Sequence, residues 1–97
     1  MHIVTRTYQR PNINIPFFED LKTRDNAYII RNFVQNGKFV SSSKVDSADG
    51  LTRTYTRTWV DEDSYLEFIS DQIVFKTHVG PKVAYNKTHG IITIENP

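Results

Sequence analysis

The segment 51–60 holds the residues that could do most of the chemistry in this sequence. Its odd positions include Arg53, Tyr55, Arg57 and Trp59, and its even positions are threonine or valine. Because alternate residues of a strand point to the same face, we predict that these four side chains share one face. Rings there could stack on an aromatic ligand, and guanidinium groups could hold a carboxylate or a phosphate. In the alternative interpretation the residues have only a packing role. The rings of Tyr55 and Trp59 then lie in a dimer interface, and the arginine stems lie along them.

Further candidate site residues lie outside this segment. His78 could act as a base because imidazole titrates near neutral pH, or it could simply contact the last carbonyls of a helix. Phe18 follows a proline-rich loop and is either a lid over a pocket or a plug in the core. The predicted catalytic residues are His78 and Arg57, and the predicted ligand-binding residues are Tyr55, Trp59, Arg53, Phe18 and Phe68.

A run of acidic residues follows Trp59, namely Asp61, Glu62 and Asp63, with Glu67 beyond. Paired carboxylates can do acid–base work when one of them is buried. The simpler interpretation is that they begin a helix and face solvent, with a capping box from Ser64 to Glu67. The three histidines are scattered and form no zinc pattern, so we expect neither a metal nor a cofactor.

The elements that would position these residues follow from periodicity and from turn signals. We predict strands at 2–9, 38–46, 51–60 and 91–95. One helix is predicted after an N-cap at Asp25 and ends at Asn36-Gly37, and the run Asp61-Glu62-Asp63-Ser64 starts a second. Gly80-Pro81 should interrupt the second helix and start a short third one. The order β-α-β-β-α-β predicts a single ferredoxin-like α+β domain over 1–97, with a four-stranded antiparallel sheet.

Composition limits the classes of protein. Ninety-seven residues form one domain, and a net charge of +1 argues against nucleic acid as a partner. The lack of cysteine excludes a disulfide framework and a cysteine nucleophile. No long apolar run or signal peptide is present, so we expect no membrane span and a cytoplasmic location. A hydrophobic share of only 38% favours a homodimer, since a second copy would bury surface that one copy cannot.

One stretch carries a family resemblance. The run Thr58-Trp59-Val60-Asp61-Glu62-Asp63-Ser64-Tyr65-Leu66-Glu67-Phe68, followed by His78, resembles the dimeric α+β barrels of the antibiotic-biosynthesis-monooxygenase type. The resemblance implies a homodimeric barrel in which the partner covers the second face of the sheet. One branch of that family degrades haem with an asparagine, a tryptophan and a histidine. His78 matches the histidine, but Phe68 stands at the tryptophan position and the first strand has no asparagine, so haem is not expected.

We therefore expect a small dimeric binding or accessory protein that holds a small apolar or aromatic ligand, or a protein partner. The alternative is a cofactor-independent monooxygenase-like enzyme or an isomerase that acts on an aromatic small molecule. A third interpretation is single-stranded RNA binding, because RNA-recognition modules share this element order and place stacking aromatics on the third strand.

Overall fold

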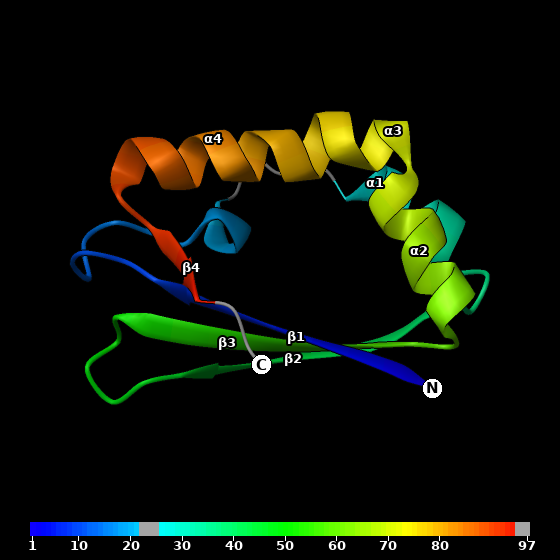
Figure 1. Cartoon of the computed structure of the whole chain (residues 1–97), viewed down its shortest axis with the longest axis horizontal. Helices are drawn as coiled ribbons and strands as arrows, with labels where there is room; N and C mark the ends of the chain where they lie inside the picture. The colour runs from blue at the N-terminus through cyan, green and yellow to red at the C-terminus, as the bar shows by residue number, and fades with distance from the viewer. Residues whose placement is uncertain (22–25, 95–97) are drawn as a thin grey trace.

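Four strands form one antiparallel sheet, and helices cover one of its faces (Figure 1). The structure is a computed structural model that describes residues 1–21 and 26–94. The strands are β1 (His2–Gln9), β2 (Phe39–Asp46), β3 (Thr52–Trp59) and β4 (Ile92–Ile94), and their order across the sheet is β2-β3-β1-β4. The fold is therefore α+β, as predicted. The Asp25 N-cap and the end of the last strand at Glu95 lie outside the described residues.

Strand register decides which side chains face the helices. On β1 and β3 the inner face carries Val4, Arg6, Tyr8, Arg53, Tyr55, Arg57 and Trp59, and the outer face is rich in threonine. On β2 a bulge between Phe39 and Ser41 changes the alternation, so Phe39 joins Ser42 on the inner face. Strict alternation along this strand would place Phe39 and Ser42 on opposite faces, but the extra residue of the bulge shifts the period of two.

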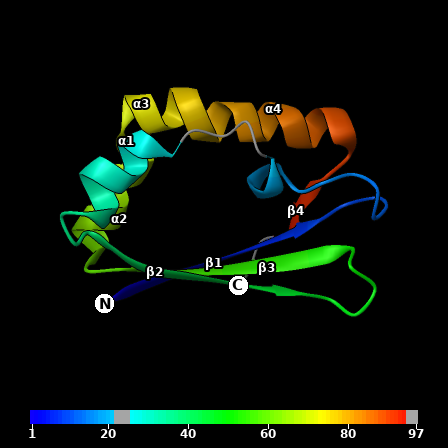
Figure 2. The same ribbon diagram turned by 180° about the vertical axis from the view of Figure 1, so that it is seen from behind.

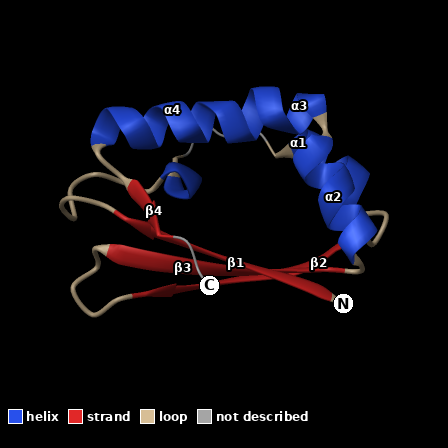
Figure 3. Cartoon of the chain, in the orientation of Figure 1, coloured by secondary structure: helices blue, strands red, loops and turns tan. Residues whose placement is uncertain are grey.

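The helical segments all lie on the inner side of the sheet (Figure 3). They are a 3-10 turn at Phe18–Asp20, α1 (Ala27–Ile29), α2 (Glu62–Ser70), α3 (Gln72–Val74) and α4 (Gly80–His89). The 3-10 turn lies between α4 and the sheet in the views from the front and from behind (Figure 2). Phe18 in this turn and Phe17 just before it are buried, at 8% and 1% exposure. Their burial agrees with the interpretation of Phe18 as a plug in the core.

Two of the helices continue into π-helical stretches. Ile30–Val34 follows α1, and Phe75–Val79 joins α3 to α4. The second stretch lies immediately before Gly80-Pro81, so the chain passes through this dipeptide without a break. Proline lacks an amide and its ring crowds the carbonyl four residues earlier, and the wider π turn accommodates both. The predicted interruption at Gly80-Pro81 is wrong, and the turn between helices falls at Asp71, where ψ is 121°.

Helix α2 begins at a cap that differs from the predicted one. The side chain of Asp61 accepts the Ser64 backbone amide at 2.8 Å, so Asp61 is the N-cap and Ser64 lies inside the first turn. The predicted start of this helix within Asp61-Glu62-Asp63-Ser64 agrees with the structure, but the predicted capping box from Ser64 to Glu67 is wrong. Helix α4 ends at His89, because Gly90 adopts the left-handed conformation at φ 72°.

The buried residues form two separate clusters. The first contains Tyr8, Phe17, Tyr55 and Ile91. The second contains Phe33, Trp59 and Val74. A domain of this size normally has one contiguous core. Here β3 joins the two clusters, with Tyr55 in one and Trp59 in the other, and Arg57 lies between them on the same face.

Candidate functional site

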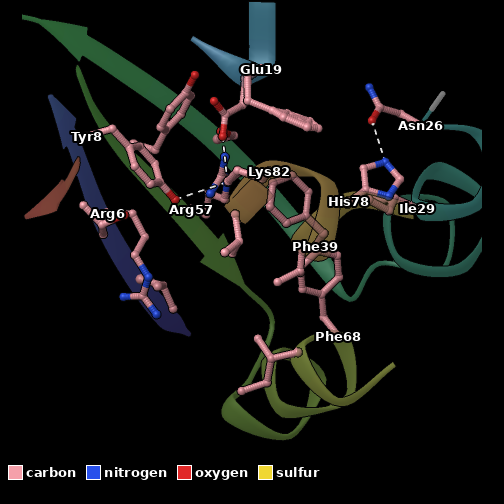
Figure 4. Close-up of a pocket in the computed structure, with 18 of the residues that line it drawn as sticks. Arg6, Tyr8, Glu19, Asn26, Ile29, Phe39, Arg57, Phe68, His78 and Lys82 are labelled. Atoms are coloured by element: carbon pink, nitrogen blue, oxygen red, sulfur yellow. Dashed lines mark hydrogen bonds and ion pairs between the residues drawn. The ribbon is translucent and has the colours of Figure 1, made fainter. Parts of the chain in front are cut away.

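A cavity of about 780 Å³ lies between the inner face of the sheet and the helices (Figure 4). The strands contribute Val4, Arg6, Tyr8, Tyr55, Arg57 and Trp59 to its lining. The helical side contributes Phe68, His78, Val79, Lys82 and Asn86, among others. This volume falls within the range of about 300–1,000 Å³ that is typical of small-molecule sites.

The structure gathers most of the predicted site residues around this one cavity. Arg57, Tyr55, Trp59, Phe18, Phe68 and His78 all line it. Arg53 does not line it, although it shares the strand and the face of Arg57. Sequence alternation placed the strand residues together, but their meeting with His78 and Phe68 depends on the tertiary fold.

Aromatic rings form one end of the cavity around Trp59. The ring centroid of Trp59 lies 4.8 Å from that of Phe68 and 5.0 Å from that of Phe39. Trp59 is only 2% exposed, and its indole N–H has no hydrogen-bond partner among the described residues. Rings at such distances and tilts attract one another through their quadrupoles. This end therefore presents a rigid, mostly apolar wall.

Charged and phenolic groups form the other end. Lys82 of α4 pairs with Glu19 at 2.6 Å and donates a hydrogen bond to the hydroxyl of Tyr8 at 3.2 Å (Figure 4). Burial opposes ionisation of Glu19, but the charges of Lys82 and, less strongly, Arg57 outweigh it and hold the pKa of Glu19 below its ordinary value. Glu19 is therefore a carboxylate at neutral pH, and it cancels the charge of Lys82.

Sequence reasoning missed Glu19, Lys82 and Tyr8 as site residues. Glu19 lies in a 3-10 turn, Lys82 follows a proline, and Tyr8 belongs to another strand. No local motif links them, because only the packing of α4 over β1 brings them together. Of the three, only Lys82 carried a weak signal in the sequence, because it is a cation one residue after the predicted start of a helix.

Arg53 and Tyr55 form a satisfied polar pair next to the cavity. Arg53 is 6% exposed and donates to Asp46 at 2.6 Å, to Asp20 at 2.8 Å and to the Tyr55 hydroxyl at 3.3 Å. The hydrogen bonds to Asp46 are the main reason that the pKa of Arg53 is raised. Burial raises the pKa of Tyr55 to about 12. Arg53 therefore serves the structure as the centre of an ion-pair network.

His78 lies at the helical wall of the cavity and within a continuous helix, not at a helix end. Its Nε2 lies 3.1 Å from Oδ1 of Asn26, and its Nδ1 lies 2.7 Å from Oγ1 of Thr77 (Figure 4). Thr77 Oγ1 donates its single proton to the Ile73 carbonyl at 2.7 Å. Both ring nitrogens of His78 therefore already have partners within the chain.

The structure corrects two interpretations of the β3 face. Tyr55 and Trp59 are buried under the helices of their own chain, at 5% and 2% exposure, so they do not form a dimer interface. An RNA-recognition sheet needs exposed stacking rings. Here the helices cover the aromatic face, and the opposite face carries threonine and serine, so the stacking surface is lacking.

Fold and site together define an α+β protein with a partly open cavity of small-molecule size between its sheet and its helices. No family model and no curated protein matches the sequence. Within the described ranges, no three His, Cys, Asp or Glu residues come together in a group that could hold a metal ion. Among the same residues no helix is both long and apolar enough to cross a membrane.

Proposed function

We propose that this protein is a small binding protein whose cavity holds a small apolar or aromatic ligand. The observation that supports this function is the position of the cavity: it divides the core into two clusters, and both clusters contribute to its walls. A core split in this way loses contacts that a continuous core would make. A ligand that bridged Tyr55 and Trp59 would restore them.

The test uses N-phenyl-1-naphthylamine, a neutral aromatic probe whose fluorescence rises in apolar surroundings. Trp59 is the only tryptophan, so energy transfer from it to the probe reports binding at this site. We expect saturable binding of one probe per chain. Val79→Phe fills the cavity and should weaken binding severalfold. Val45→Phe is the matched control, because Val45 is 69% exposed on the outer face. Equal binding by both variants would contradict the proposal.

We also propose the ferredoxin-like topology and a homodimer in which a second copy covers the outer face of the sheet. The strand order β2-β3-β1-β4 supports the topology. The outer face supports the dimer, because it carries Ile3 at 62%, Ile92 at 54% and Ile94 at 40% exposure, and no described helix covers it. The resemblance to dimeric α+β barrels implies the same arrangement. The cytoplasmic location stays a prediction.

Light scattering tests the dimer. Thr56 lies at the centre of the outer face, between Thr5 and Ser43. We expect the wild-type chain to be a dimer and Thr56→Arg to be a monomer, since two buried cations would face each other. Thr88→Arg adds the same charge to the exposed surface of α4 and should leave the dimer intact. A monomeric wild type at micromolar concentration would exclude the barrel.

A second candidate function is a monooxygenase-like enzyme, and His78 is the observation that favours it. His78 lines the cavity, and its Nε2 would accept a phenol proton there if the phenol displaced Asn26 from that nitrogen. Oxygen uptake with a phenolic polycyclic aromatic is the assay, with His78→Gln as the test variant and His89→Gln as the control on the exposed end of α4. If the wild type consumes no oxygen, this candidate is removed and the binding function stands.

A further inference from the structure

Arg53 and Arg57 form a matched pair whose partners differ. Both lie on the inner face of β3, and both lie beside the Tyr55 ring, with Cζ at 5.9 Å for Arg53 and 4.6 Å for Arg57. The register places Asp46 of β2 opposite Arg53 but Ser42 opposite Arg57. The same strand therefore gives one arginine a carboxylate neighbour and gives the other none.

Arg57 makes no hydrogen bond and no ion pair with any residue in the described part of the chain. Its side chain is half-buried and lines the cavity. The guanidinium Cζ lies over the Tyr55 ring at 4.6 Å from its centroid, which is cation–π range, and this contact uses none of its N–H donors in a hydrogen bond. A guanidinium in this position is a fixed fork of donors that suits a carboxylate.

The remaining charges of the cavity do not neutralise Arg57. Among the described lining residues Glu19 is the one acidic residue, and its ion pair is with Lys82 at 2.6 Å. The charge of Arg57 acts on Glu19 more weakly and without an ion-pair contact. Arg6 and Lys87 also line the cavity, but both are exposed, and Arg6 already donates to the hydroxyl of Tyr65 at 3.0 Å. Arg57 therefore combines two properties that no other described lining cation has together. Its side chain is partly buried, and no ion pair balances its charge.

The apolar wall begins next to this charge. Trp59 is two residues further along the same face of β3, and Val4 is opposite Arg57 on β1. Phe68 and Phe39 extend the wall around Trp59. A ligand that fits both parts needs a flat apolar body and one negative charge at its edge.

We propose that the ligand is an aromatic carboxylate, with its carboxylate held by Arg57 and its ring system against Trp59 and Phe68. This inference rests on the proposed binding function and adds the chemical class of the ligand. A neutral aromatic would leave the Arg57 charge unbalanced, and a dianion such as a phosphate monoester would carry more charge than Arg57 neutralises.

The experiment compares 2-naphthoate with 2-naphthamide by isothermal titration calorimetry. The two probes share a ring system and differ in charge. Because a hydrogen bond to a charged group is stronger than a neutral one, we expect the carboxylate to bind about tenfold more tightly. In Arg57→Met the arginine stem is largely kept and the charge is lost, so the ratio should fall to about one.

Arg31→Met is the matched control, because it removes the same charge from an exposed position outside the cavity. It should keep the tenfold ratio. If both probes bind the wild type equally, the carboxylate assignment is wrong while the binding function stands. If neither these probes nor N-phenyl-1-naphthylamine binds, the binding function itself fails. If Arg57→Met does not fold, the ratio of the two affinities for the wild type still tests the carboxylate assignment. A cationic probe, 2-naphthylmethylammonium, then serves as a second measurement and must bind the wild type more weakly than 2-naphthamide does.

Discussion

The ion pair between Lys82 and Glu19 offers the sharpest test of the packing of α4 over the sheet. Lys82→Met removes the ammonium and keeps most of the stem, so Glu19 remains in place without its cation. Removing one partner from a fully buried ion pair costs about 3–5 kcal/mol. The side chains here are 13% exposed for Glu19 and 23% for Lys82, and Arg57 still stabilises the carboxylate. We therefore expect a loss of about 2–3 kcal/mol in the free energy of unfolding at neutral pH.

The pH dependence of this loss has a definite sign. In the wild type the pKa of Glu19 lies below its ordinary value of 4.5. The stabilisation by the pair is therefore complete above that pH and is lost as the pH falls through the folded-state pKa. In Lys82→Met burial acts without the opposing ammonium, so Glu19 takes up a proton more readily. The difference between variant and wild type should therefore shrink on acidification.

Urea denaturation followed by circular dichroism measures both effects, at neutral pH and near pH 4. The double variant Glu19→Gln/Lys82→Met is the control, because it leaves no unpaired charge and should recover part of the loss. A destabilisation below about 0.5 kcal/mol would mean that the pair is an ordinary surface contact. An equal loss at both pH values would refute the reasoning about Glu19.

Three further changes test other parts of the structure. Asp71→Ala removes the cap that accepts the backbone amides of Ile73 and Val74, and urea denaturation should show a loss of about 1–2 kcal/mol at neutral pH. Since the pKa of Asp71 is lowered mainly by the amide of Val74, this loss should fade below pH 3.8. Burial raises the pKa of Tyr55 to about 12, so its contribution is complete below pH 10 and decreases above it, and Tyr55→Phe should reduce the alkaline loss of stability in thermal denaturation. Gly90→Ala should lower stability by about 1 kcal/mol from backbone strain at φ 72°, because the added Cβ meets only Pro11 at an ordinary 3.6 Å.

The sequence pattern was most informative along β3. Strict alternation over ten residues fixed both the strand and the shared face of Tyr55, Arg57 and Trp59, because a strand repeats every two residues whatever surrounds it. Alternation cannot say what covers that face. The helices of the same chain cover that face, so the rings of Tyr55 and Trp59 lie in the interior and not in the dimer interface that was the alternative.

Other features depend on contacts between segments far apart in the chain. The bulge in β2 placed Phe39 beside Trp59, and no residue type in Phe39–Asp46 announces it. Glu19 and Lys82 are 63 positions apart, and their pairing at 2.6 Å needs the docked helix. The cap of α2 was misplaced because Asp61 and Ser64 are both good capping residues, and only the backbone turn selects between them.

The π-helical stretch Phe75–Val79 makes the lining of the cavity depend on chain length as well as on side chains. A π turn can be regarded as an α-helix that has gained one residue, and each residue of an α-helix turns the chain by about 100°. Deletion of one residue here would restore an α-helix and rotate all of α4 about its axis. Lys82 and Asn86 would then leave the cavity wall together, and neighbouring side chains would replace them. A single-codon deletion would thus exchange several lining residues of the cavity at once, a change that no single point substitution produces.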